Sequence, residues 1–246
     1  MTSPFHPLLF AWDAWALTVL VIVAQPLHAF LRLHGRLGRS GPRPAQFGAY
    51  LEGMALQWAL VAALAGVAWH HHLTFRDFGL HGDVSGRAWA LTAGLLVLGA
   101  AMALAQYLQL RKLTPRERRE KLGPVWFFIP ATTQDQWAWT ALSLTAGICE
   151  ELLYRGWILN LAIAATGSRT GGLLLASALF GLAHAYQGLK GIAQTGLAGF
   201  GLSALYLGTG SLIPGQLVHA AVDLSGGLLA SRLVEEGSGE AAIVEA

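Results

Sequence analysis

The sequence predicts an all-α protein, a polytopic membrane helical bundle of about seven to eight transmembrane helices. Three observations predict this class. Hydrophobic residues make up 54% of the 246 residues, charged residues only 12%, and the mean hydropathy is +0.49. A soluble domain needs more polar residues than this to cover its surface. In addition, seven mostly apolar stretches contain about 18 or more residues each, which is enough to cross a bilayer as helix.

The apolar stretches divide the chain into four parts. Three of them, at about 8–31, 50–70 and 88–110, form an N-terminal transmembrane part over residues 1–110. Four more, at about 137–163, 171–188, 191–208 and 211–233, form a C-terminal transmembrane part over residues 137–234. Between them, residues 111–136 mix charges, prolines and aromatic residues, which predicts a cytoplasmic or interfacial linker. The tail over 235–246 is predicted to be disordered.

Charge and cysteine content narrow the partners and the topology. A net charge of +2 is too small to indicate nucleic-acid binding. Because most of the chain is apolar, membrane lipids are the expected partners. The basic residues follow the first and third apolar stretches: Arg32, Arg36, Arg39 and Arg43, then Arg111, Lys112, Arg116, Arg118, Arg119 and Lys121. The positive-inside rule places both groups in the cytoplasm, with the N-terminus outside and the C-terminus inside. A single cysteine, Cys149, excludes an intramolecular disulfide framework.

The C-terminal transmembrane part contains few ionisable residues, and they are of a few types. Between residues 137 and 234 the only acidic residues are Glu150, Glu151 and Asp223, and the only histidines are His184 and His219. A charged side chain near the centre of a transmembrane helix costs at least about 2.5–3.5 kcal/mol on insertion scales. One such residue alone can be a helix-packing hydrogen bond. Five of them on three apolar stretches indicate a functional site.

Helical spacing predicts which residues of the glutamate pair cooperate. Glu151 and Arg155 are four residues apart and share a helix face, so Arg155 can neutralise Glu151 and hydrogen-bond to it. Glu150 lies about 100° around the helix and escapes that pairing. We expect one carboxylate to be held in an ion pair and its neighbour to be available as a base, although the two roles can be exchanged.

The remaining polar residues repeat the same spacing on two other helices. His219 and Asp223 are four residues apart, so the carboxylate can fix the tautomer of the imidazole or serve beside it as a ligand. Phe180 and His184 have the same spacing. Three helices thus each present one polar stripe, and together they can surround one water molecule.

Polar residues outside these motifs carry weaker predictions. The run His70, His71 and His72 resembles a metal-binding tract, but it lies at the end of an apolar stretch with no acidic partner within it. Asp13, Gln25, His28 and Glu52 are expected to be helix-packing or pathway residues. Cys149 is expected to be a small packing residue.

The three motifs resemble those of the CPBP (Abi, or CAAX-protease-like) family of intramembrane proteases, over roughly residues 137–225. The family pattern is E-E-x-x-x-R, then F-x-x-x-H, then a histidine followed four residues later by Asn or Asp. Here these are Glu150-Glu151-Leu-Leu-Tyr-Arg155, Phe180-Gly-Leu-Ala-His184 and His219-Ala-Ala-Val-Asp223. Asp223 stands where many eukaryotic members have Asn, so it is expected to be protonated, paired with His219, or a metal ligand.

The resemblance implies an endopeptidase that hydrolyses a peptide bond in a membrane-associated protein or peptide, in a bacterial-type inner-membrane protein. By position, Glu150 and His184 would activate water, while His219 and Asp223 would stabilise the oxyanion or assist binding. Glu151 and Arg155 would orient the site, with Phe180 as structural support.

The sequence leaves alternatives open for the cofactor, the function class and the substrate. The family has been described both as metalloproteases and as metal-independent glutamic proteases. If a metal is used, a Zn²⁺ or other divalent ion would be held by His184, His219 and Glu150. A non-catalytic membrane scaffold or immunity-type peptide-binding protein is an alternative function, and a carrier with a proton relay is another. Neither the substrate nor the oligomeric state follows from the sequence.

Overall fold

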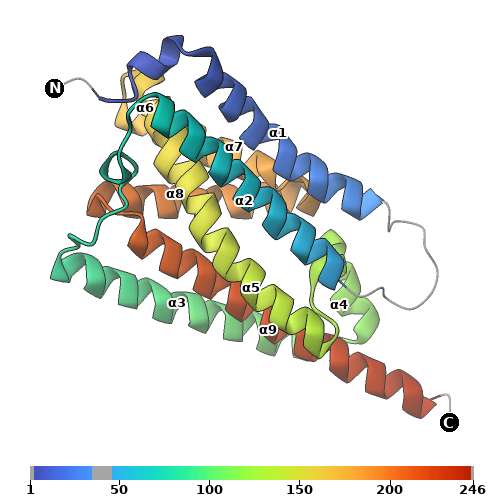
Figure 1. Ribbon diagram of the computed structural model, residues 1–246. Helices are drawn as coiled ribbons and strands as arrows, with labels where there is room; N and C mark the ends of the chain where they lie inside the picture. The colour runs from blue at the N-terminus through green and yellow to red at the C-terminus, as the bar shows by residue number, and fades with distance from the viewer. Residues whose placement is uncertain (1–2, 35–45, 245–246) are drawn as a thin grey trace.

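The computed structural model describes residues 3–34 and 46–244, and within these residues it contains helices and no strand. The all-α membrane bundle is therefore confirmed (Figure 1). Its main helices are α1 (Trp12–His34), α2 (Phe47–His70), α3 (Gly86–Arg111), α4 (Pro115–Leu122), α5 (Thr133–Glu150), the π-helix η4 (Glu151–Leu159), α6 (Asn160–Thr166), α7 (Arg169–Ala183), α8 (Gly188–Thr209) and α9 (Ile213–Val244). Short 3₁₀ helices are η1 (Pro7–Phe10), η2 (Phe75–Phe78), η3 (Gly123–Phe128) and η5 (Ala185–Gln187).

Four of the described helices, α1, α2, α3 and α9, are long and apolar enough to cross a membrane. The pair α7 and α8 is a fifth candidate when it is taken as one span, bent by 55°. The sequence predicted separate spans at 171–188 and 191–208. However, the 15 residues of α7 extend only about 22 Å as helix, which is shorter than the hydrocarbon core of about 30 Å. Residues 133–166 are helical throughout, but η4 divides them.

Small residues let the helices that carry the polar motifs approach closely. Helix α5 packs between α2 and α9, α7 packs on α8, and α3 lies along α9 (Figure 1). A Cβ atom on Gly147 of α5 would stand 2.7 Å from Cβ of Ala220 on α9. One on Gly181 of α7 would stand 2.7 Å from the carbonyl oxygen of Ile192 on α8. Such close contacts between backbones replace the hydrophobic effect as the packing force in lipid.

The two ends of the bundle are joined in different ways. At the end where α2 leads to α3, Leu212 donates to the carbonyl oxygen of Gly79 at 2.9 Å, and Ser211 donates to that of His81 at 2.9 Å. The C-terminal end of α1, helix α4 and the C-terminal end of α9 are all at the other end of the bundle (Figure 1). The basic residues of α4 and Arg32 are therefore at the same end, as the topology prediction requires. Arg36, Arg39 and Arg43 lie outside the described residues, and the side of the membrane stays a prediction.

The predicted linker contains helices α4 and η3, and α9 extends into the predicted tail. In the linker, Arg118 is buried and donates to the carbonyl oxygens of Leu110, Arg111 and Leu233 at 3.0–3.2 Å, which fastens α4 to the C-terminal end of α3 and to α9. Helix α9 continues as far as Val244 and so enters the tail, and disorder over 235–246 stays a prediction. Glutamate and alanine favour helix, and extending an existing helix needs no new nucleus.

Candidate active site

Two adjacent glutamates at the junction of α5 and η4 lie in different surroundings. Glu150 is the last residue of α5 and borders a cavity, whereas Glu151 begins η4 and is fully buried. Helical spacing in the sequence predicts regular α-helix here, whereas residues Glu151–Leu159 form a π-helix. Segments of π-helix are rare and are frequent at functional sites, because the wider turn re-aims the side chains around it.

Glu151 is the centre of a buried hydrogen-bonded group. Its Oε1 atom accepts from Nη1 of Arg155 at 2.7 Å, so the predicted ion pair is present. The same oxygen accepts from Nδ1 of His219 at 2.8 Å. The guanidinium of Arg155 also lies over the ring of Phe180, 4.3 Å from its centroid, and donates to the carbonyl oxygen of Gly199 at 3.3 Å. Three helices, η4, α7 and α8, thus hold one charged side chain, and α9 joins them through His219.

The bond to Glu151 determines the tautomer of His219. A carboxylate paired with arginine can only accept, so Nδ1 of His219 carries a proton and Nε2 points the other way. Nε2 lies 3.9 Å from Oε2 of Glu150 and 3.6 Å from Oδ2 of Asp223. Glu151, on another helix, makes the bond that fixes this tautomer. Asp223 pairs with the other ring nitrogen of His219, which was one of the expected arrangements, and its side chain is 38% exposed.

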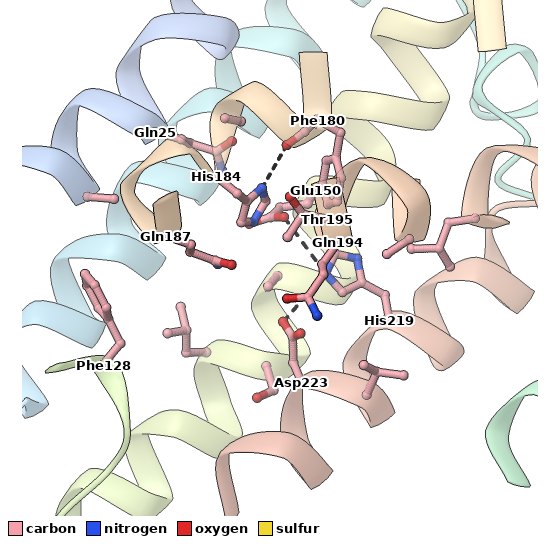
Figure 2. Close-up of a pocket in the computed structure, with 18 of the residues that line it drawn as sticks. Gln25, Phe128, Glu150, Phe180, His184, Gln187, Gln194, Thr195, His219 and Asp223 are labelled. Carbon is pink, nitrogen blue, oxygen red and sulfur yellow. Dashed lines mark hydrogen bonds and ion pairs between the residues drawn. The ribbon is translucent and has the colours of Figure 1, made fainter. Parts of the chain in front are cut away.

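His184 presents one nitrogen to the cavity for a similar reason. It caps the C-terminus of α7, and its Nδ1 is 2.9 Å from the carbonyl oxygen of Phe180. Because a carbonyl oxygen only accepts, Nδ1 carries the proton and Nε2 of the neutral ring is an acceptor. Figure 2 shows His184 and Glu150 pointing toward one another inside the pocket, with His219 and Asp223 on the other side of Glu150.

The N-terminal part contributes a residue that sequence reasoning missed. Gln57 on α2 is nearly buried and donates from Nε2 to Oε1 of Glu150 at 2.9 Å. This bond uses one carboxylate oxygen and leaves Oε2 facing His219. The signal available in the sequence was an amide in the middle of the apolar stretch 50–70, a position where lipid-facing side chains are apolar.

These groups line one cavity of about 810 Å³ between the two halves of the bundle. Most of its lining is apolar, which suits a site for an apolar ligand with a few oriented polar groups. The polar residues that line it include Gln25, His28, Arg32, Gln57, Ser143, Glu150, His184, Gln187, Gln194, Thr195, His219 and Asp223. Gln25 and His28 are among the expected pathway residues; Glu52 pairs with Arg32 and lies 3.4 Å from His28. Asp13 does not line the cavity and instead contacts His71.

Comparison with known families gives a match to this part of the chain. Residues 132–225 match a family model described as type II CAAX prenyl endopeptidase, Rce1-like. Residues 132–225 form an Rce1-like domain. Comparison of the chain with curated proteins and with solved structures gave no match. The Rce1-like domain contains all three motifs, whereas α1, α2 and Gln57 lie outside the matched residues.

The polar cluster of the Rce1-like domain does not fit a metal ion in the described arrangement. One ion requires three donor atoms close together, since each lies about 2.0–2.2 Å from zinc. Within residues 3–34 and 46–244, only Asp13, His70 and His71 bring three such atoms within 4.8 Å of one another. His184, His219 and Glu150, the ligands predicted for a metal-dependent enzyme, do not converge in this way.

Proposed function

We propose that the Rce1-like domain hydrolyses a peptide bond in a membrane-associated protein or peptide, with water activated by Glu150 and His184. This proposal rests on the different surroundings of the two carboxylate oxygens of Glu150. Gln57 occupies Oε1, while Oε2 faces the cavity beside His219. A carboxylate oriented in this way inside an apolar cavity is suited to act as a general base.

In the first step, water lies between Oε2 of Glu150 and Nε2 of His184. Because Nδ1 of His184 donates to Phe180, Nε2 accepts a hydrogen bond from this water and orients it. The water oxygen attacks the carbonyl carbon of the scissile bond, and its proton passes to Glu150. A tetrahedral intermediate with a negatively charged oxygen results.

The second step needs a donor for this oxyanion and a proton for the leaving amine. His219 in its imidazolium form donates Nδ1–H to Glu151 and presents Nε2–H to the oxyanion, with Asp223 as a nearby counter-charge. Glu150 then returns the proton to the amide nitrogen and the carbon–nitrogen bond breaks. One water is consumed, and one carboxylic acid and one amine are formed.

Three further residues would position this machinery without touching the substrate. Glu151 fixes the ring of His219, Arg155 neutralises Glu151, and Phe180 packs against Arg155 and both imidazoles. Cys149 is fully buried, which supports a packing role instead of a nucleophilic one. For the substrate, the largely apolar cavity and the family description together favour a C-terminal tail that carries a prenyl group.

Cleavage by the purified protein in liposomes tests this proposal. The substrates are a matched pair of peptides with a CAAX-type C-terminus, one farnesylated and one not, and the products are identified by mass spectrometry. We expect the wild type and Cys149→Ala to release the same C-terminal fragment from the farnesylated peptide. Cleavage of both peptides at equal rates would mean that the protein does not recognise the prenyl group of its substrate. No cleavage of either peptide, or of other membrane-bound peptides, would overturn the proposed hydrolase function.

A further inference from the structure

We propose that Asp13, His70 and His71 form a zinc-binding site at the junction of α1 and α2. The site is separate from the cavity, since none of these three residues lines it. It also lies outside the Rce1-like domain, which covers residues 132–225. Among the residues that the structure describes, this is the one group of three such side chains whose ligand atoms all lie within 4.8 Å of one another.

The geometry of the three side chains is close to that of a zinc site. Nε2 of His71 lies 3.0 Å from both carboxylate oxygens of Asp13. Two donors bound to one tetrahedral zinc ion stand about 3.4 Å apart, so this pair needs only a small separation to admit the ion. The rings of His70 and His71 are 4.8 Å apart between centroids. His70 is exposed, so its side chain can rotate to complete the set.

The local fold explains why an aspartate 58 residues away reaches this tract. Helix α2 ends through a left-handed residue, His72, with φ of 56°, and Leu73 donates back to the carbonyl oxygen of Ala68 at 2.9 Å. This is the hydrogen-bond pattern of a Schellman turn, in which the left-handed residue is most often glycine. The turn ends α2 beside the first turn of α1, where Asp13 lies.

The chemistry of the site favours a divalent cation. Two imidazoles and one carboxylate are a ligand set typical of zinc, with water in the fourth position. The C-terminal end of α2 carries partial negative charge, which favours a cation there. Trp12 and Trp69, next to the site, are 82% and 86% exposed. Exposed tryptophans mark the membrane–water interface, where aqueous zinc has access.

Zinc bound here would pin α1 to α2, two helices that line the cavity with Gln25 and Gln57. The role is structural, because no donor of the site reaches the polar cluster around Glu150. A purified preparation would then contain zinc that takes no part in water activation. The inference does not depend on the proposed hydrolase activity.

Zinc titration of the purified, metal-stripped full-length protein, with no affinity tag attached, tests the inference. Bound zinc is measured by equilibrium dialysis and elemental analysis for the wild type, His70→Ala, His71→Ala and Asp13→Asn. His72→Asn is the matched control, because it removes an imidazole of the same tract while asparagine tolerates the left-handed conformation. His70→Ala changes an exposed side chain and so keeps the test independent of folding.

We expect one zinc ion per wild-type chain, the same in His72→Asn and Glu150→Gln, and a loss of affinity of at least tenfold in His70→Ala and His71→Ala. Zinc should also raise the melting temperature of the wild type but not of His71→Ala. Absence of bound zinc, which would leave His71 and Asp13 as an ordinary ion pair, would overturn the inference. Zinc lost from Glu150→Gln and retained by His71→Ala would overturn it as well, because the ion would then belong to the other cluster.

Discussion

Nδ1 of His219 donates to Oε1 of Glu151 at 2.8 Å, across two helices that are far apart in the sequence. This bond gives the two adjacent glutamates different tasks. Glu151 is occupied by His219 and Arg155 inside the protein, and Glu150 faces the cavity with one oxygen toward Nε2 of the same imidazole.

Replacing Glu151 by glutamine should destabilise the protein strongly. The substitution leaves the buried guanidinium of Arg155 without its counter-charge, and breaking a buried ion pair on one side costs roughly 3–5 kcal/mol. Unfolding in mixed micelles measures the change. The control is Glu120→Gln, which removes an exposed partner at the same spacing from Arg116 and should change stability little. Equal effects of the two substitutions would contradict the central role given to Glu151.

Replacing Gln57 by leucine should lower kcat about tenfold to a hundredfold without unfolding the protein. A hydrogen bond to a charged group contributes about 1.5–3 kcal/mol, and here it fixes which oxygen of Glu150 faces the cavity. Steady-state cleavage rates and the melting temperature should be compared with those of Gln25→Leu, which removes another amide of the cavity lining. A wild-type kcat in Gln57→Leu would mean that Glu150 is positioned without this amide.

Gly215 should not accept a side chain. A Cβ atom there would stand 3.0 Å from Oε2 of Glu151, and Arg155 and His219 restrain that carboxylate through bonds to its other oxygen, Oε1. Gly215→Ala is expected to cost about 1–3 kcal/mol, as overpacking does, and to lower cleavage. On the same helix Gly226→Ala meets nothing within 4 Å, and should be neutral or stabilising. The two variants need to be compared by thermal unfolding and by rate; a neutral Gly215→Ala would be inconsistent with this packing.

Chelation should not stop cleavage. The polar cluster around Glu150 does not bring three donors close enough for one ion, and water activation is assigned to side chains. Initial rates with and without EDTA should agree within about twofold when measured below the melting temperature of the zinc-free protein. Loss of activity on chelation, with recovery on adding Zn²⁺ in a His71→Ala background, would instead place a metal in the cleavage site.

The helical class and the pairing of side chains within one helix could be predicted from the sequence, because both depend on local information. Composition determines the membrane setting, and spacing along one helix pairs Glu151 with Arg155. Contacts between helices were not predictable in this way. The bond from Gln57 to Glu150, like that from His219 to Glu151, depends on how the helices are rotated against one another. The π-helix after Glu150 has no periodic signature, and Asp13 reaches His71 only through the turn at His72.

The cleavage rate of Glu150→Gln tests the central claim most directly. The amide keeps the size of the side chain but cannot take a proton from water, and general acid–base catalysis contributes about 10²–10⁴-fold. Single-turnover cleavage of a membrane-bound peptide should therefore fall at least about a hundredfold in Glu150→Gln, while the melting temperature and peptide binding stay near wild type and Glu120→Gln remains active. A rate within tenfold of wild type in a folded Glu150→Gln protein would contradict the account.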